Sequence, residues 1–460
     1  MGSAAAPRAA ALLGLGFGDC GKGLFTDYLC RQWPVHSVVR FNGGAQAGHN
    51  VVLPDGRHHT FSQFGAGSFV PGVATVLAQP VVLHPTALLV ENDALQQAGV
   101  TDALARLLID ARCRITTPFH QAAGRLRELA RGEFAHGTCG AGVGETVRHA
   151  LLHPGEALHY GDLARPDILT RLETIRQRLR GEFSATQPNR SDAAWQAEMR
   201  MLDDAVVGPR WLDSALDLVR RAAPATAAAI SELLRRPGTV LFEGAQGVLL
   251  DEWRGFHPHT TWSTIHSTAV EQVAAGYGLA ERIMHLGVLR SYLTRHGPGP
   301  LPTHDPNLDN LAEPHNSGAG WQGPFRRGHP DALLLQYALA TVGRLDGLLV
   351  SHLDAFERAG GLQWCTSYDA PAAAEDAALC TRNTLDRAVT RLLPAVGGAD
   401  LAHQARLTRL LESARPRYAN RPITSPAAYL ESLSALTAYR PLFGSHGPTH
   451  EMVRRLAAPG

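Results

Sequence analysis

The sequence predicts an α/β fold in which a parallel or mixed sheet is covered by helices. Three segments near the N-terminus carry this prediction: an apolar run at 9–15 that ends in glycines, a helical pattern at 24–31 and a strand pattern at 36–41. A strand, a loop, a helix and a second strand in this order favour parallel pairing. The chain has 460 residues, 45% of them hydrophobic, which is enough for a large core.

The same patterns continue along the chain. Further strands are expected at 75–84, broken by Pro80, and at 239–243, 284–292 and 347–353. Leu and Ala recur at helical spacing within 101–134, 192–235 and 331–343. Pro209 and Pro224 are expected to break the second of these helical stretches. We therefore expect one large domain over residues 1–460, with a helical insertion at about 100–235.

The stretch 295–330 is the least regular part of the chain. It is rich in Gly, Pro, Asn and His and has no sustained period. Because a long irregular segment in a compact enzyme is usually functional, we expect a mobile substrate loop there. Residues 366–377 and 393–405 are expected to be surface connections.

Composition excludes several classes of protein. The chain has 43 basic and 42 acidic side chains, so charge gives no reason to expect nucleic acid or a membrane surface as a partner. None of the six cysteines lies in a C-x-x-C pair, which favours reduced thiols. Residues 9–15 resemble a core strand more than a signal peptide, and no run of 18 apolar residues predicts a membrane span. We expect a cytoplasmic protein.

The strongest local signal is the segment Gly16–Gly23, GFGDCGKG, between the first strand and the first helix. Glycines let backbone N–H groups turn toward an anion, the helix N-terminus adds positive potential, and Lys22 neutralises phosphate charge. Asp19 suits such a loop if it holds Mg²⁺ or removes a proton from the substrate. The alternative is an ordinary glycine-rich turn, because Gly23 stands where the common phosphate-loop pattern has Ser or Thr.

Other segments accompany this loop in a fixed order. They are VVRFNGGAQAGHNVV at 38–52, FEGAQGVLLD at 242–251, LRSYLTRHGPGPLPT at 289–303, HLD at 352–354 and GSHGPTHEM at 444–452. In identity, order and spacing the sequence resembles the adenylosuccinate synthetase family of purine biosynthesis, from about residue 11 to residue 453. The resemblance implies a large central, mostly parallel sheet flanked by helices, with a phosphate-loop-like nucleotide site, and a homodimer whose interface lies near the active site.

The resemblance also implies an activity. The family transfers the γ-phosphate of GTP to the 6-oxygen of IMP, and the amine of aspartate then displaces that phosphate. By this resemblance Asp19 is the base that deprotonates the purine and a ligand of Mg²⁺, and the carbonyl of Gly48 completes the metal site. His49 donates to the transferring oxygen and Lys22 stabilises phosphate charge. Positioning and charge neutralisation are what in-line phosphoryl transfer needs.

The resemblance assigns two further groups of contacts. Asp354 accepts hydrogen bonds from guanine, a carboxylate being suited to the guanine edge, and His352 stands where the family stacks a lysine on the base. The other GTP contacts implied are Gly18, Gly21, Gly23, Ser445, Gly447 and Pro448. The contacts implied for the purine nucleotide or the amine are Gln46, Thr138, Gln246, Thr261, Arg295 and Arg326.

Three departures from the family are visible in the sequence. Cys20 replaces a glutamate in the phosphate loop. Cys139 and Ala141 replace a threonine and an arginine beside Thr138, which weakens the expected grip on a 5′-phosphate. The amino-acid loop, 318–328, has lost threonines and arginines and gained Trp321 and Phe325.

The third departure leaves two interpretations open for the amine. Each lost charge-assisted contact costs about 1.5–3 kcal/mol, so the loop favours an apolar or aromatic amine, or one with a single carboxylate. Alternatively, aspartate is still captured by Arg295, Arg326 and Arg327.

Two functional hypotheses follow. The first is a GTP-dependent ligase that replaces the phosphorylated 6-oxygen of an IMP-like nucleotide with aspartate or another amine. The second is a non-catalytic purine-nucleotide sensor or regulator that keeps the pocket. An ordinary phosphate-loop GTPase is disfavoured, because the loop lacks its Ser or Thr.

Overall fold

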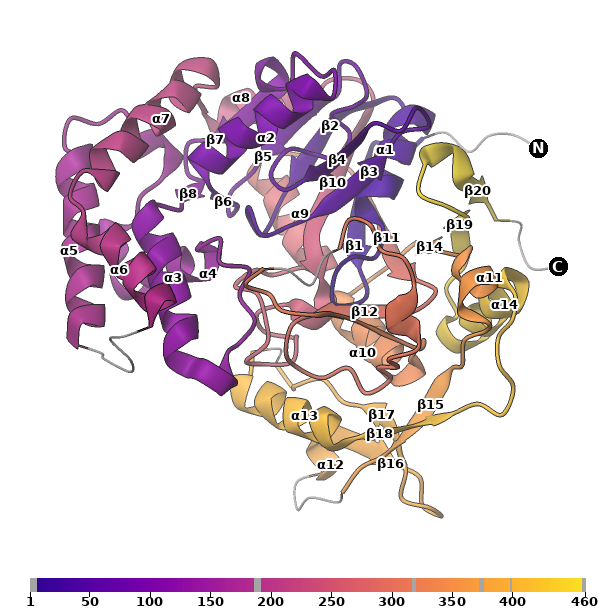
Figure 1. Ribbon diagram of the computed structural model, residues 1–460. Coiled ribbons are helices and arrows are strands. Elements are labelled where there is room, and N and C mark those ends of the chain that lie inside the picture. The colour runs from indigo at the N-terminus through magenta and orange to yellow at the C-terminus, as the bar shows by residue number, and fades with distance from the viewer. Residues whose placement is uncertain (1–5, 186–191, 317–319, 372–375, 398, 457–460) are drawn as a thin grey trace.

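A large parallel sheet forms the centre of the molecule. The computed structural model describes residues 6–185, 192–316, 320–371, 376–397 and 399–456 (Figure 1). Within these ranges the sheet has ten strands, in the order β20-β19-β14-β11-β1-β10-β2-β5-β7-β9. Their bounds are β1 Ala9–Gly14, β2 Val35–Arg40, β5 Ala74–Leu77, β7 Leu107–Asp110, β9 Pro224–Ala225, β10 Thr239–Gly247, β11 Ile283–Arg290, β14 Gly347–Ser351, β19 Pro441–Ser445 and β20 Val453–Arg455. The terminal strand β20 is antiparallel to β19, and the other pairs are parallel.

Strand β1 lies at the middle of the sheet, between β10 and β11, with Ala9 in register with Val240 and Ile283. Its side chains alternate between two cores. Ala9, Ala11 and Leu13 join the larger core, and Ala10 and Leu12 join the core on the opposite face. Because both faces are buried, the strand is a continuous apolar run. The predicted α/β class and mostly parallel sheet are confirmed.

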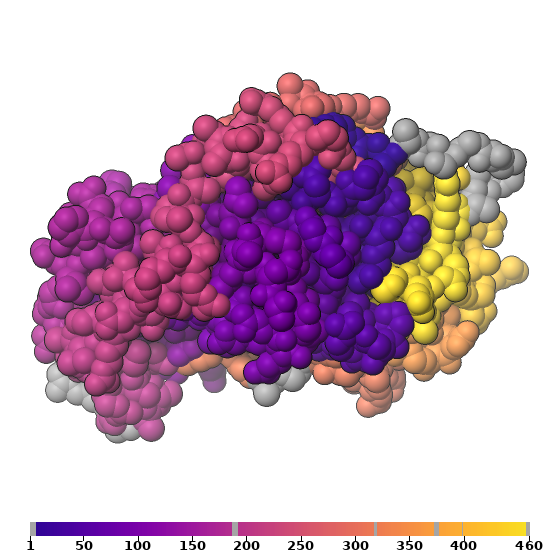
Figure 2. Space-filling view, turned by 90° about the horizontal axis from the view of Figure 1, so that it is seen from above, coloured from indigo at the N-terminus to yellow at the C-terminus, as the bar shows by residue number. Residues whose placement is uncertain are grey.

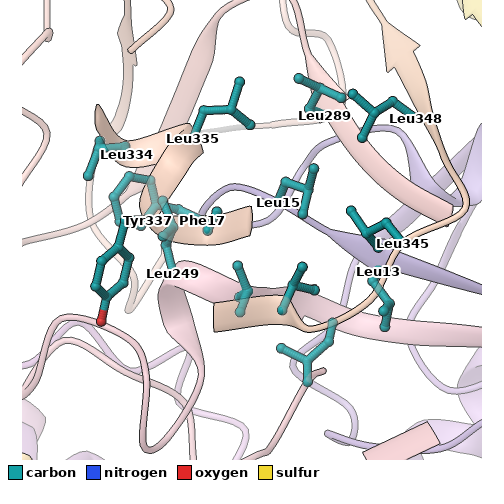
Figure 3. Packing of buried hydrophobic residues seen from close by; sticks show 14 of the residues in the cluster. Leu13, Leu15, Phe17, Leu249, Leu289, Leu334, Leu335, Tyr337, Leu345 and Leu348 are labelled. Atoms are coloured by element: carbon teal, nitrogen blue, oxygen red, sulfur yellow. The ribbon is translucent and has the colours of Figure 1, made fainter. Parts of the chain in front are cut away.

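Helices cover both faces of this sheet. Leu24, Phe25 and Leu29 of α1 pack with the core that contains Leu12. On the other face, helices α9 and α10 supply much of the larger core, where Leu13 and Leu15 lie near Leu345 and Leu348 (Figure 3). The helices beside the sheet are α1 Lys22–Gln32, α2 Pro85–Gln97, α8 Ala227–Leu234, α9 Ser267–Gly276, α10 Ala332–Val342, α11 Ala355–Ala359 and α14 Pro426–Thr437.

A helical unit stands to one side of the sheet (Figures 1 and 2). It consists of α3 Pro118–Arg131, α4 Val143–Leu152, α5 Ile168–Ala185, α6 Ala193–Asp203 and α7 Val207–Arg221. Most of these helices share one core with α2 and with the edge of the central sheet at β5 and β7. The predicted helical insertion thus corresponds mainly to residues 118–221, while the division of residues 1–460 into domains stays a prediction.

Two expectations for this region are wrong. Residues 101–117 form no α-helix: Leu104–Arg106 make a single 3-10 turn, Leu107–Asp110 form β7, and Arg114–Ile115 form β8, which pairs with β6 Val82–Leu83. Pairing of β7 with β5 and β9 overrides the helical spacing of its leucines. Pro209 does not end a helix, because it lies in the first turn of α7, where a proline removes no intrahelical hydrogen bond.

Smaller sheets complete the fold. Strands β3 His49–Val52 and β4 His58–Phe61 form a hairpin, and β12 Leu293–His296 pairs with β13 Phe325–Gly328, so the predicted loop at 295–330 begins and ends in regular structure. A four-stranded sheet contains β15 Cys365–Asp369, β16 Cys380–Arg382, β17 Val389–Leu392 and β18 Arg415–Tyr418, beside α12 Asp376–Leu379 and α13 Leu401–Ser413. The predicted connections at 366–377 and 393–405 are therefore partly regular. Within the described ranges, every helix is too short or too polar to cross a bilayer.

Candidate active site

One cavity of about 1410 Å³ opens at the carboxyl ends of β1, β10, β11 and β14. This edge is where α/β sheets commonly bind ligands. Most residues predicted for the site line it, namely Gly18, Asp19, Gly21, Lys22, Gly23, Gln46, Gly48, His49, Thr138, Gln246, Thr261, Arg295, His352, Asp354, Gly447 and Pro448. Arg326 and Ser445 are outside this lining.

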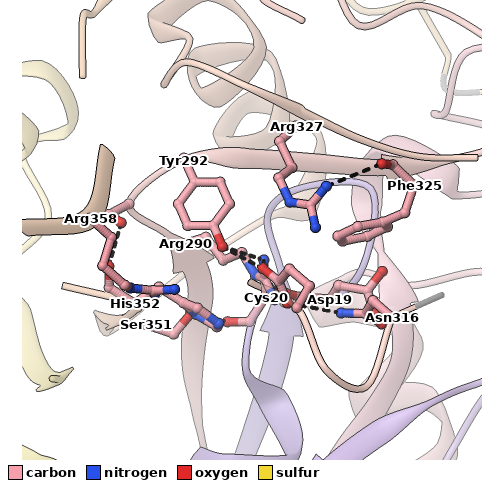
Figure 4. Close-up of polar contacts among 12 residues, drawn as sticks. Asp19, Cys20, Arg290, Tyr292, Asn316, Phe325, Arg327, Ser351, His352 and Arg358 are labelled. Carbon is pink, nitrogen blue, oxygen red and sulfur yellow. Dashed lines mark hydrogen bonds and ion pairs between the residues drawn. The ribbon is translucent and has the colours of Figure 1, made fainter. Parts of the chain in front are cut away.

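The phosphate loop leaves β1 and turns sharply before α1. Gly18 and Gly21 have φ of 111° and 91°, and Asp19, which is not a glycine, has φ of 47°. Left-handed backbone is costly for a residue with a side chain and persists only where its surroundings enforce it. The guanidinium of Arg290 donates to the carbonyl of Asp19 (Figure 4). The Ser351 hydroxyl donates to the carbonyl of Cys20 over 2.9 Å.

Both of these anchors come from neighbouring strands, since Arg290 ends β11 and Ser351 ends β14. A Cβ at Gly21 would lie 2.7 Å from the Ser351 Cβ, so the anchor also requires the glycine. The loop is therefore held in place by the sheet edge that it covers.

Two charged side chains of this loop face the cavity. The Lys22 ammonium is buried in the first turn of α1, 3.6 Å from the Cys20 sulfur. The Asp19 carboxylate lies 3.5 Å from His296 Nε2. At Gly23 a Cβ would lie 2.7 Å from the carbonyl oxygen of Asn50. The close approach of the 49–50 backbone thus explains why no Ser or Thr follows the lysine.

His49 is held by β10. Its Nδ1 lies 2.7 Å from the Glu243 carboxylate, and its Nε2 lies 2.8 Å from the carbonyl of Ala245, so both ring nitrogens face acceptors. Glu243 also accepts from the Thr26 hydroxyl and the Ala66 N–H. Burial alone would raise the pKa of Glu243, but His49 and, to a lesser degree, Arg40 hold it at about 2. His49 lines the cavity with both nitrogens engaged by the protein.

A second buried carboxylate, Glu313, lies beside the phosphate loop. It pairs with Arg290 and accepts from the Tyr292 hydroxyl. The Asn316 amide donates to it over 3.2 Å. Burial opposes ionisation, yet Arg290 holds the pKa of Glu313 well below its usual range. Figure 4 shows Arg290 between Tyr292 and the backbone of Asp19 and Cys20.

The opposite end of the site carries the residues predicted for the base of GTP. His352 has φ of 60°, and its N–H donates to the Ser445 hydroxyl over 3.2 Å. Ser445 therefore supports His352 from behind and does not line the cavity. Asp354 pairs with Arg358 over 3.0 Å, and both residues line the cavity.

Three of the residues predicted to bind the purine substrate differ in how far the protein already satisfies them. Gln246 donates to the carbonyl of Ser263 over 2.9 Å. The amide atoms of Gln46 are buried and have no hydrogen-bond partner among the described residues. The Thr138 hydroxyl accepts from the N–H of Gly140 over 3.3 Å. Gln46 is thus the group that most needs a ligand.

The backbone around Thr138 is held by Glu128 of α3. One carboxylate oxygen of Glu128 accepts from the N–H groups of His136, Gly137 and Thr138, at 2.9, 3.0 and 3.4 Å. The other oxygen pairs with Arg131. These N–H groups are therefore engaged by an internal carboxylate.

The two arginines predicted to bind the amine are bonded to backbone. Arg295 donates to the carbonyls of Pro298, Pro300 and His259, and burial, reinforced by Arg326, lowers its pKa to about 9. Arg326 donates to the carbonyls of Gly297 and Gly299, at 2.6 and 2.8 Å.

The aromatic residues of the same loop are also outside the cavity lining. Trp321 packs against Gly140 and lies 5.5 Å from the Arg125 guanidinium, while Phe325 packs on His296. Neither side chain therefore forms part of this cavity's wall, and the choice between aspartate and another amine stays a prediction. Residues 317–319 of this loop lie outside the described residues.

Sequence reasoning missed Glu243, Arg290, Glu313 and His296. Glu243 had a signal, because it is a charged residue in an otherwise apolar strand, TVLFE. Glu313 had no such sequence signal, because its irregular segment meets Arg290 only in the folded protein.

Comparison with known proteins supports the same family over most of the chain. The family model described as adenylosuccinate synthetase matches residues 11–415. The adenylosuccinate synthetase of Rhodococcus opacus (strain B4) is 34% identical over 363 residues, which cover 78% of this chain and 80% of that protein. That of Mycobacterium leprae (strain TN) is 33% identical over 367 residues, with 78% and 80% covered.

Two solved structures share the fold. The fully ligated adenylosuccinate synthetase from Plasmodium falciparum superposes with a TM-score of 0.73 at 19% identity, covering 98% of this chain and 100% of that one. The cyanophage S-2L succinoaminodeoxyadenylate synthetase (PurZ), bound to dGMP and to dATP as an energy donor, gives 0.61 at 14% identity, covering 98% and 95%. Because the family model matches most of the chain and the relatives are more than 30% identical to it, the chain belongs to the adenylosuccinate synthetase family of GTP-dependent ligases. These enzymes form a C–N bond at the purine 6-position.

Proposed function

We propose that this chain phosphorylates the 6-oxygen of an IMP-like purine nucleotide with GTP and replaces the resulting phosphate with an amine. The observation that supports this most is that one cavity is lined by the phosphate loop with Asp19 and Lys22, by the unsatisfied amide of Gln46, and by Asp354. A nucleoside triphosphate and a second purine both have groups to contact in it.

Asp19 takes the N1 proton of the purine, which makes the 6-oxygen nucleophilic. Lys22 and the N-terminus of α1 stabilise charge on the transferring phosphoryl group. His49 donates to the 6-oxygen once its contact with the carbonyl of Ala245 is exchanged for the substrate, while Glu243 keeps the ring oriented. The contact with Glu243 makes this a positioned imidazole and not a free loop side chain.

Magnesium fits this site only together with a nucleotide. Among the described residues, no three His, Cys, Asp or Glu side chains are grouped as a metal site. Mg²⁺ commonly takes one or two carboxylates and completes its shell with phosphate oxygens and water. Asp19 and the carbonyl of Gly48 would hold it, and the bound ion would neutralise phosphate charge.

Asp354 would accept from N1–H and N2–H of guanine, with Arg358 holding the carboxylate in place. Further proposals carried over from the family are a homodimer and a cytoplasmic location. The amine is aspartate or another amino acid.

Phosphoryl transfer is tested without knowing the amine. GTP labelled with ¹⁸O in the β–γ bridge is incubated with the protein, Mg²⁺ and IMP, and scrambling of the label into non-bridging positions is followed by mass spectrometry. Scrambling that requires IMP supports reversible transfer to the purine. Tight binding of both nucleotides without scrambling would support a nucleotide sensor instead.

A further inference from the structure

Most of the arginine and lysine side chains that line the cavity are paired with carboxylates of the protein itself. Five of the seven form ion pairs: Arg127 and Arg148 share Glu145 and Glu182, Arg131 pairs with Glu128, Arg290 with Glu313, and Arg358 with Asp354. The two that face no carboxylate at ion-pair distance are Lys22 and Arg295. This count covers the described residues of the lining.

Neither Lys22 nor Arg295 is available to bind the second carboxylate of an amine such as aspartate. Lys22 belongs to the phosphate loop, where a triphosphate claims its charge. Arg295 is 2% exposed and already donates to three backbone carbonyls. A second carboxylate would have to break an existing ion pair or stay without a charged partner, and both cost free energy.

The cavity offers apolar surface instead. Trp253, Trp262 and Leu401 are large hydrophobic residues that are 39%, 44% and 39% exposed, and all three line it. Exposed indoles on a concave wall are typical of a ligand contact.

Trp253 and Leu401 belong to one wall of the cavity. Helix α13 begins at Leu401, and its Gln404 amide donates to the carbonyl of Trp253 over 3.0 Å. The hydroxyl of Thr408 in the same helix donates to the carbonyl of His257 over 2.7 Å. Burial lowers the pKa of His257, which keeps this neighbour uncharged at neutral pH.

Trp262 stands at the α4 side of the cavity, where a Cβ on Gly144 would be 3.3 Å from its ring. The wall around Trp253 and Leu401, together with Trp262, is called the apolar wall below. This wall presents large apolar side chains and the uncharged imidazole of His257, whereas an amine with two carboxylates would need cations there.

We infer that the amine co-substrate carries no more than one carboxylate and presents an apolar or aromatic body to the apolar wall. This rests on the proposed phosphoryl transfer. In the step, the amine nitrogen attacks C6, the C6–O bond breaks, and phosphate leaves with the electron pair. The amine loses one proton to solvent, so that GTP, the 6-oxopurine and R–NH₂ give GDP, phosphate and the 6-(N-substituted) aminopurine.

The test compares five amines, one at a time. The full-length protein, GTP, Mg²⁺ and IMP are incubated separately with L-aspartate, L-asparagine, L-leucine, L-phenylalanine and benzylamine, and phosphate release and product mass are measured. The best of the four amines without a side-chain carboxylate is expected to exceed aspartate in kcat/KM at least tenfold. A smaller ratio, or a preference for aspartate, overturns the inference.

The label-scrambling assay separates this inference from the proposed function. Scrambling with IMP, but no turnover of any of the four amines, overturns the amine class and leaves phosphoryl transfer standing. Absence of scrambling rejects the proposed function, and the inference with it.

Variants test the wall directly. Trp262→Ala and Leu401→Ala are expected to raise KM for the best amine at least fivefold. Leu385→Ala is the matched control, because Leu385 is 92% exposed and lies outside the cavity lining. Leu401→Arg adds a cation to the apolar wall and is expected to shift the kcat/KM ratio toward aspartate at least fivefold. An unchanged KM in both alanine variants would contradict the role of the wall.

Discussion

Arg290 and Glu313 form a buried ion pair that joins the phosphate loop to the irregular segment after β12. The same guanidinium donates to the carbonyl of Asp19, so the segment carrying Glu313 is tied to the residue proposed as the base. One guanidinium thus joins the segment 312–316 to the backbone of Asp19.

Replacing Glu313 with Gln should therefore impair both stability and turnover. Removing one partner of a buried pair leaves a charge without compensation and costs about 3–5 kcal/mol. We expect a loss of that order in denaturant unfolding, with kcat reduced at least tenfold. The control is Glu281→Gln, which breaks an exposed pair with Arg8 and should change stability by less than about 1 kcal/mol. Equal effects of the two changes would contradict the coupling.

Asp19→Asn should abolish turnover while leaving the fold intact. The amide cannot accept the N1 proton, but it preserves the size of the side chain. Label scrambling with GTP and IMP should disappear, and circular dichroism and the melting temperature should stay close to those of the unchanged protein. Full activity in this variant would remove Asp19 as the base.

Asp354→Asn should weaken discrimination for guanine. A carboxylate accepts from both N1–H and N2–H of guanine, whereas adenine offers an acceptor at N1. Loss of a charge-assisted hydrogen bond is worth about 1.5–3 kcal/mol, so the ratio of kcat/KM for GTP over ATP should fall about tenfold or more. If the ratio is unchanged, the base of the triphosphate lies elsewhere.

The pair of His49 and Glu243 makes stability depend on pH. Because the folded pKa of Glu243 is about 2, below its ordinary value of about 4.3, the ionised form stabilises the fold. That contribution is complete above the unfolded pKa and is lost as pH falls from about 4.5 toward 2; it amounts to about 3 kcal/mol.

Glu243→Gln removes this dependence. The difference in free energy of unfolding between the unchanged protein and Glu243→Gln should be largest at pH 7 and should shrink below pH 4.5. Urea unfolding at pH 7, 5, 4 and 3 measures it. A difference that stays constant over this range would show that ionisation of Glu243 does not stabilise the fold.

Strands β1, β2, β5, β10, β11 and β14 of the central sheet could be predicted from sequence because nearly all their residues are buried. An apolar run such as TVLFE at 239–243 predicts a buried strand. The phosphate loop could also be predicted, because the spacing of its glycines reflects where the backbone needs a positive φ. Strand β7 was misread because its leucines fit a helix as well as a strand, and only pairing with β5 decides between them.

The contents of the site were harder to foresee. Sequence identified Arg295 and Arg326 as cations, but which acceptors they bond to depends on segments brought together by the fold. Their guanidinium groups are turned to the carbonyls of 259 and 297–300. Likewise, nothing local marks Leu401 as lining the same cavity as Trp253, since the two residues are 148 positions apart in the chain.

The close contact between Gly23 and the backbone of residues 49–50 can be tested by substitution. A Cβ there would lie 2.7 Å from the carbonyl oxygen of Asn50 and 2.9 Å from the carbonyl carbon of His49. Gly23→Ala should cost about 1–3 kcal/mol through overpacking and displace His49. Gly181→Ala in α5, where nothing lies within 4 Å of the added carbon, should be neutral or slightly stabilising.

This tight spot also limits how the loop can be re-engineered. In many nucleotide-binding loops the residue after the lysine supplies a hydroxyl to the ion, and here the hairpin strand fills the space that such a hydroxyl would need. A serine at position 23 would displace the His49 imidazole from the Glu243 carboxylate before the serine hydroxyl could reach a metal ion. Conversion of this scaffold into an ordinary GTP hydrolase would thus require moving the β3–β4 hairpin, not changing a single side chain.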